Sequence, residues 1–131
     1  MDDMTISFRY GPARFVLVYP AAIKNMPQDK LKKLFRLMVC DWNREANADA
    51  VRLTYQYLNS YVEETKTAWV EASKAYQNGF VDTKYHYCSN KRAAAANNEK
   101  LLDAVKRSKA GHERAKKLLT AFEDVESKYF R

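Results

Sequence analysis

The residue types best suited to acid–base or metal chemistry gather at Tyr85–Cys88, where the sequence reads Tyr-His-Tyr-Cys. On a helix, His86 and Cys88 are two positions apart, so their side chains do not face each other. No second Cys/His pair occurs at a metal-ligand spacing, and a zinc site is therefore not expected. A nucleophilic Cys88 would need a base and an oxyanion donor from elsewhere, and no pattern marks either. We interpret this segment as packing and expect no metal ion or cofactor.

The other titratable residues favour structural roles. His112 falls on an apolar stripe, and the sequence after it lacks the second His of an HExxH site. Asp41 and Glu45 are four positions apart, but a solvated helix face does not separate the pKa values of two carboxyls as acid–base catalysis requires. With three glycines in the chain, a phosphate-cradling glycine loop is excluded. We expect a protein that is not an enzyme.

Charge placement is the strongest functional signal in the sequence. The chain carries 23 Lys and Arg against 16 Asp and Glu, a net charge of +7. Six basic residues between positions 106 and 117 face a single acidic residue, Glu113. They are Lys106, Arg107, Lys109, Arg114, Lys116 and Lys117. A second basic cluster comes early and comprises Lys24, Lys30, Lys32, Lys33 and Arg36.

On a helix, Arg107 and Arg114 lie opposite His112, so one face is basic while the other packs. Basic side chains spaced along a rigid helix can follow a phosphate backbone. A run of charge is also the ordinary composition of a solvated helix face, and both interpretations stay open.

Two tyrosines are candidates for an aromatic contact with a partner. Tyr57 lies nearly opposite the apolar seam of the helix predicted for residues 47–77, and Tyr61 lies on its flank. An exposed tyrosine there would suit a partner protein or a stacked base. The alternative is that the N-terminal segment covers Tyr57, because residues 5–42 must pack against something.

The helix predicted for residues 47–77 is the central element. Its apolar or near-apolar residues recur at alternating steps of four and three, which is the seam of a helix packed lengthwise on another. They are Val51, Tyr55, Leu58, Val62, Thr65, Trp69, Ala72 and Tyr76. Asn78-Gly79 ends it, and Asp82 is a candidate cap for the next helix. Residues 82–129 are helical in composition, as one helix or two, so we predict an antiparallel helical hairpin.

The β signal is confined to residues 5–19, where two alternating or β-branched runs flank Gly11-Pro12. This pattern predicts a β-hairpin. The fixed φ of proline disfavours it in the favoured two-residue turns, so we expect a longer loop through Gly11–Arg14. An isolated hairpin is marginal in water and must lie on helices or gain a third strand from a partner.

Residues 27–42 read as a short amphipathic helix, with Pro27 in its first turn and apolar residues on one face. The predicted fold is therefore mainly α (α+β), a single domain over residues 1–131. An N-terminal β-hairpin and one short amphipathic helix precede two long antiparallel helices that form a helical hairpin.

Two classes of function follow. The leading hypothesis is a small interaction protein that binds a nucleic acid, a nucleoprotein complex or an acidic protein through its basic helix face. An accessory or inhibitor protein of a phage or mobile element would have this size and charge. The alternative is a protein–protein module or homodimer that acts through the helical seam or the β edge. The N-terminus lacks a signal-peptide pattern, and no apolar run is long enough for a membrane span, so we expect a cytoplasmic protein without a membrane partner.

Overall fold

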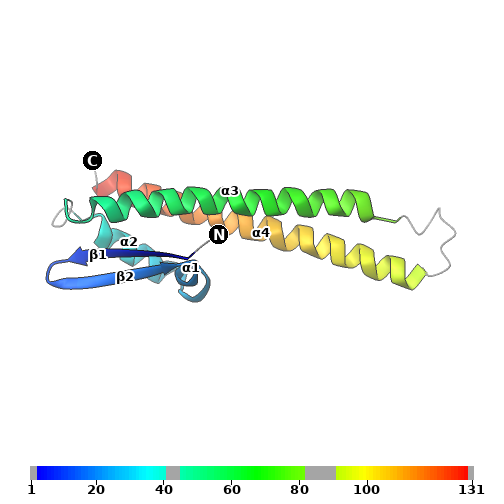
Figure 1. Cartoon of the computed structure of the whole chain (residues 1–131), viewed down its shortest axis with the longest axis horizontal. Helices are drawn as coiled ribbons and strands as arrows, with labels where there is room; N and C mark the ends of the chain where they lie inside the picture. The colour runs from blue at the N-terminus through cyan, green and yellow to red at the C-terminus, as the bar shows by residue number, and fades with distance from the viewer. Residues whose placement is uncertain (1–2, 41–44, 82–90, 130–131) are drawn as a thin grey trace. The chain divides into compact units, whose positions relative to one another are not determined.

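The computed structural model describes residues 3–40, 45–81 and 91–129. Two antiparallel strands come first, followed by two short and two long helices (Figure 1). Their bounds are β1 (Met4–Tyr10), β2 (Ala13–Tyr19), α1 (Ala21–Asn25), α2 (Gln28–Met38), α3 (Ala48–Gly79) and α4 (Lys91–Tyr129). The long helices α3 and α4 pack against each other, which confirms the predicted fold class.

The described residues form two compact units that share α3 and α4. Unit 1 comprises Met1–Ser60 and Lys116–Arg131, and unit 2 comprises Tyr61–Ala115. The single domain expected over residues 1–131 stays a prediction. Over its described length α4 is one continuous helix, while the expected cap at Asp82 lies outside the described residues.

The hairpin loop is shorter than predicted. Tyr10 pairs with Ala13, so only Gly11 and Pro12 lie between the strands. Gly11 has a φ of 60°, and no described residue other than glycine has a positive φ. This matches the φ pattern of a type II′ turn, whose second central position takes the negative φ of proline. The expectation of a longer loop was wrong. A type II′ turn needs a positive φ only at its first central position, where Gly11 lies, so proline can occupy the second.

The segment after the hairpin also differs from the prediction. A five-residue helix, α1, follows Pro20, whose carbonyl accepts hydrogen bonds from the backbone N–H groups of Ile23 (3.0 Å) and Lys24 (3.1 Å). Helix α2 then ends at Met38, short of the predicted end at residue 42. Its apolar face is buried as expected, with Leu31, Phe35 and Met38 all inside.

The core of unit 1 contains residues of both strands and of all four helices. Tyr19 of β2 stacks on Tyr57 of α3 with ring centroids 4.6 Å apart. Phe35 of α2 meets Phe122 of α4 edge to face at 5.0 Å. The hairpin and α2 bury a face of α3 that the seam did not include, and Tyr55, predicted to lie in the seam, is 40% exposed.

Asn47 joins three segments of this core and is itself fully buried. Its side-chain Oδ1 accepts the backbone N–H of Arg9 at 2.8 Å, and its Nδ2 donates to the Arg9 carbonyl at 2.7 Å. The same Nδ2 donates to the carbonyl of Met38, at the end of α2, at 3.0 Å. The amide therefore pairs with the hairpin as a further strand would, and also holds the end of α2 beside the start of α3 (Ala48).

Unit 2 is a two-helix arrangement with a thinner core. Thr65 Oγ1 lies 3.2 Å from His112 Nδ1, and the His112 ring stacks on Trp69 at 5.7 Å. Near the end of α3, Asn98 of α4 binds both backbone groups of Val81, at 3.0 Å and 2.8 Å. Residues with higher numbers towards the end of α3 thus contact residues with lower numbers in α4, so the two helices run antiparallel. With one neighbour only, the α3 seam in this unit is half-buried.

We predict that Asn47→Ala lowers the free energy of unfolding by about 2–4 kcal/mol, because three backbone groups at a buried site lose their hydrogen-bond partner. Urea-induced unfolding followed by circular dichroism measures the change. Asn59→Ala is the control, because the Asn59 amide donates to the Tyr55 carbonyl of its own helix. We expect it to cost less than about 1 kcal/mol. Equal costs for the two variants would refute the bridging role.

We predict that Trp69→Ala lowers the free energy of unfolding by about 1–3 kcal/mol, less than for a fully buried Trp, because the ring is half-buried against His112. Val70→Ala on the same turn of α3 is the control. Val70 is 42% exposed, so its truncation should cost under about 0.5 kcal/mol. If Trp69→Ala cost no more than this control, the packing assigned to unit 2 would be incorrect.

Candidate nucleic-acid interface

Helix α4 separates its apolar and basic residues onto opposite sides. The residues that face the interior include His112 and Ala115 in unit 2, and Leu118 and Phe122 in unit 1. All six basic residues between positions 106 and 117 are exposed. Four of them belong to unit 2, namely Lys106, Arg107, Lys109 and Arg114. Arg107 and Arg114 are seven residues apart, so they lie on one side of the helix about 10 Å apart along its axis.

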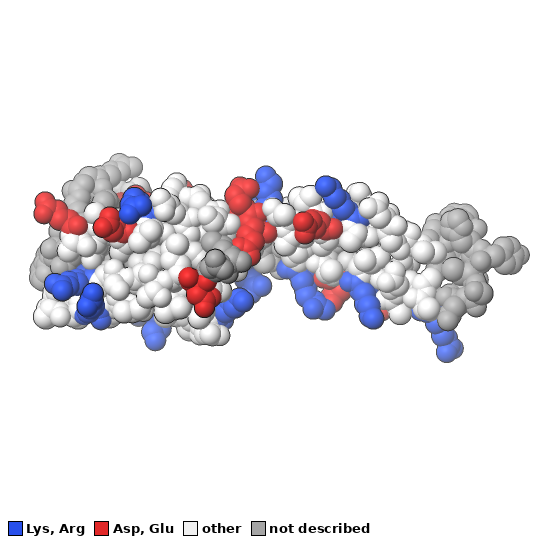
Figure 2. Space-filling view, in the orientation of Figure 1, with Lys and Arg blue, Asp and Glu red and all other residues white. Residues whose placement is uncertain are grey.

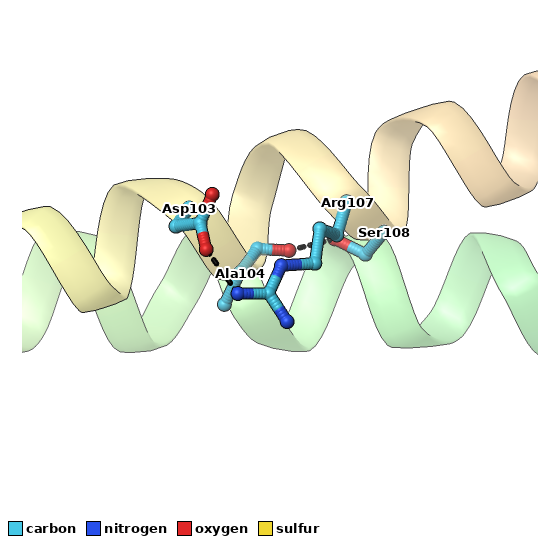
Figure 3. Close-up of polar contacts among 4 residues, drawn as sticks. All are labelled: Asp103, Ala104, Arg107 and Ser108. Atoms are coloured by element: carbon cyan, nitrogen blue, oxygen red, sulfur yellow. Dashed lines mark hydrogen bonds and ion pairs between the residues drawn. The ribbon is translucent and has the colours of Figure 1, made fainter.

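Arg107 is oriented by its own helix. Its guanidinium donates to the carboxylate of Asp103, one turn earlier, and the two side chains are 80% and 52% exposed (Figure 3). On the same turn the Ser108 hydroxyl donates to the Ala104 carbonyl at 2.7 Å. An exposed ion pair of this kind contributes little free energy. A phosphate can therefore replace Asp103 at small cost.

Lys109 has a different environment. Its Nζ lies 5.9 Å from the centre of the Trp69 ring, a cation–π distance. The ring in turn stacks on His112, so the ammonium group is directed towards α3. Lys109 thus borders the seam, while Arg107 and Arg114 are exposed on α4.

Acidic side chains limit the positive field. Asp103 and Glu113 are both exposed on α4 in unit 2, within the same stretch as the basic residues. On the face shown in Figure 2, Lys and Arg side chains are interspersed with Asp and Glu. The basic residues of α4 therefore form discrete contact points and not a uniform positive surface.

The early basic cluster lies in unit 1, on α1 and α2. Four of its five side chains are exposed, namely Lys24, Lys30, Lys33 and Arg36. The fifth, Lys32, is half-buried. Lys116 and Lys117 of α4 also belong to unit 1. The predicted basic residues are thus divided between the two units, and we build the candidate site from those of unit 2 alone.

The aromatic candidates need a correction. Tyr57 is 1% exposed, because Tyr19 of the hairpin stacks on it, so it offers no contact to a partner. The N-terminal segment covers it, as the alternative interpretation held. Tyr61 is half-buried in unit 2.

The remaining candidates are the residues considered for catalysis or metal binding. Tyr85–Cys88 and Asp41 lie outside the described residues, and Glu45 is exposed. His112 is a buried seam residue. In the part of the chain that the structure describes, no group of three or more His, Cys, Asp and Glu side chains is placed to hold a metal ion.

Two basic residues were missed by the sequence reasoning. Arg9 and Arg14 are directly paired across the hairpin, and both are exposed. Side chains directly opposite each other on one sheet face interact, and two like charges there repel. A two-residue loop at Gly11-Pro12 would have aligned them, so the mistaken loop length hid this pair.

Two groups in unit 1 have displaced pKa values. Burial raises the pKa of the Tyr19 phenol far above its usual range, the nearby Thr54 hydroxyl opposes this, and the neighbouring Tyr57 adds to it. Burial also raises the pKa of the Glu126 carboxyl, and the negative charge of Glu123 one turn earlier adds to the effect. Both groups belong to unit 1, and both shifts reflect packing there.

We predict that Glu126→Gln raises the melting temperature at pH 7. A carboxyl with a raised folded-state pKa binds more protons in the folded than in the unfolded protein, so its contribution to stability falls as the pH rises between the two pKa values. The gain should shrink as the pH is lowered towards about 4, near the unfolded pKa of Glu. Glu113→Gln, exposed on the same helix, matches the change in net charge. Scanning calorimetry of both variants checks this, and a gain for Glu126→Gln no larger than that for Glu113→Gln would refute the prediction.

No described helix combines the length and hydrophobicity needed to cross a membrane. Comparison of the chain with protein-family models, curated proteins and solved structures found no match. Arguments about its function therefore come from its own residues.

Proposed function

We propose that this chain is a small, non-enzymatic cytoplasmic protein that binds nucleic acid, alone or in a nucleoprotein complex, through the basic face of α4. The observation that carries the proposal is the exposure of the basic side chains of α4 in unit 2, opposite a buried face that includes His112 and Ala115. They are Lys106, Arg107, Lys109 and Arg114. The packing of α4 against α3 in unit 2 therefore leaves these basic side chains exposed.

The chemistry of these groups suits a phosphate backbone. Lys and Arg neutralise phosphates and release condensed counterions, which makes the affinity fall steeply with salt. Arg107 and Arg114 supply planar guanidinium groups that pair with phosphate oxygens in a bidentate manner. Binding of this kind reads the backbone, so it should depend little on base sequence.

The helical seam does not favour the alternative function of a homodimer. The predicted seam residues of unit 2 pack α3 on α4 within one chain, as the Trp69–His112 stack illustrates. A second copy would have to displace that contact. The β edge is a separate surface.

We predict that Arg107→Glu with Arg114→Glu lowers the affinity for a fluorescein-labelled DNA oligonucleotide by about tenfold or more, because two phosphate contacts become repulsive. Fluorescence anisotropy measures the dissociation constant over a series of salt concentrations. The slope of its logarithm against log salt should decrease in magnitude by about two, one for each lost contact. Far-UV circular dichroism should show an unchanged helical content.

The matched control is Lys66→Glu with Lys74→Glu. Both lysines are exposed on α3 in unit 2, and the double substitution changes the net charge by the same amount. We expect the control to lose less than about threefold in affinity, the effect of net charge alone. Equal losses of affinity in the two double variants, or no loss in the arginine variant, would refute binding through the basic face of α4.

A further inference from the structure

Along the outer edge of β2, backbone N–H and C=O groups pair with no strand that the structure describes. The sheet has two strands, β1 and β2, so each has an outer edge. Arg9 turns its N–H and C=O outward from β1, because both bind the side chain of Asn47. Arg14 is the residue paired with Arg9, so its N–H and C=O turn outward from β2. By the two-residue period of a strand, Val16 and Val18 do the same.

The outer edges of β1 and β2 differ in how they are covered. The edge of β1 is covered at Arg9 by the side chain of Asn47, and helix α2 also contacts β1. Along the edge of β2, Arg14 is the only charged residue, and Ala13–Tyr19 contains no proline, lysine or bulge. Its outward side chains are apolar and accessible, with Val16 55% and Val18 40% exposed.

A groove runs beside this edge. It has a volume of about 320 Å³ and is lined on one side by Val16–Val18. Its other side comes from α1 and the start of α2, including Ala21, Met26 and Lys30. An added strand would place alternate side chains over the valines and against this largely apolar wall.

The charge around the groove selects among occupants. Between Asp3 and Lys30 the chain has four basic and two acidic residues, a net charge of +2. The basic ones are Arg9, Arg14, Lys24 and Lys30, and the acidic ones are Asp3 and Asp29. Among the described residues that line the groove, Lys30 carries the charge. A second copy of this chain would bring the same charges to the same place, so the field opposes pairing of β2 with β2 and favours a strand that carries carboxylates.

We propose that the free edge of β2 is a docking site for an extended acidic segment of another protein, which adds as a third strand with alternating apolar and acidic side chains. Backbone hydrogen bonds to Arg14, Val16 and Val18 supply the pairing. Arg14 and Lys30 meet the carboxylates. This inference does not depend on the nucleic-acid proposal, because it uses none of the residues of α4.

The test uses a labelled seven-residue peptide that alternates valine with aspartate or glutamate. We expect it to bind the full chain with a micromolar dissociation constant, as suits a contact of a few residues. Amide resonances of Arg14, Val16 and Val18 should shift and gain protection from hydrogen exchange. Absence of binding at a peptide concentration of about 1 mM would overturn the proposal.

Two peptide variants separate strand addition from simple charge attraction. N-methylation of the residues whose N–H groups face β2 should abolish binding, whereas N-methylation of the alternate residues should preserve it. Equal binding of the two methylated peptides would mean that charge alone holds the peptide, and would refute strand pairing. A peptide with lysine in place of the acidic residues should not bind.

Val16→Glu tests the protein side, because it puts a like charge on the edge that meets the peptide. We expect a loss of about tenfold or more in affinity. Ser7→Glu is the control, since Ser7 is the exposed partner of Val16 on the inner strand, and the same charge there should cost less than about threefold. Equal losses would refute the edge position. A dimer in analytical ultracentrifugation at about 100 µM protein would show that a second copy occupies the edge instead.

Discussion

The side-chain amide of Asn47 connects the hairpin, the end of α2 and the start of α3 through three hydrogen bonds, of 2.7, 2.8 and 3.0 Å. A two-stranded hairpin is not stable by itself in water, so it needs an external surface. The apolar face of the hairpin meets that need through Tyr19, which stacks on Tyr57. Hydrophobic contact alone leaves the register of the strands against the helices loosely specified. The amide supplies that register, because a buried asparagine that lost its partners would be costly.

Asparagine plays a corresponding part in unit 2, where Asn98 binds both backbone groups of Val81. In each unit, a single side chain satisfies the N–H and C=O of one residue where regular secondary structure ends or has an open edge. Such groups are strong donors and acceptors and are rarely left unpaired when buried. Both contacts join segments distant in the sequence, so they constrain the fold far more than a helix cap does.

The two units differ in how deeply they bury apolar surface. In unit 1 the hairpin, α2 and α4 together enclose residues such as Phe35 and Phe122, which are 0% exposed. In unit 2 α3 has α4 as its packing neighbour, and its seam side chains are half-buried. Stabilisation per residue is therefore concentrated in unit 1. The solvated side of α4 in unit 2 is free to carry charge, which is where the basic residues of the proposed nucleic-acid face lie.

Local patterns determined the type and order of the principal elements. The alternation in residues 5–19 predicts a hairpin, the seam from Val51 to Tyr76 predicts a long helix, and the outward charges of α4 follow from the same periodicity. These features depend on neighbours within one or two turns, so the sequence alone is enough to find them. The exposure of the basic residues from Lys106 to Lys117 belongs to this class. The short helix α1 and the end of α2 at Met38 were not predicted, because element boundaries depend on weaker local signals.

Contacts between distant segments decided the rest. Tyr57 is buried and Tyr55 exposed because the hairpin and α2, and not α4 alone, pack on the first part of α3. The role of Asn47 required Arg9 and Met38 to be brought to it from distant parts of the chain. The outward face of β2 likewise depends on the register set by a two-residue loop. The sequence by itself thus determined the periodic elements and their charged faces. The tertiary structure decided which face is covered, because burial depends on the neighbours that each element meets in space.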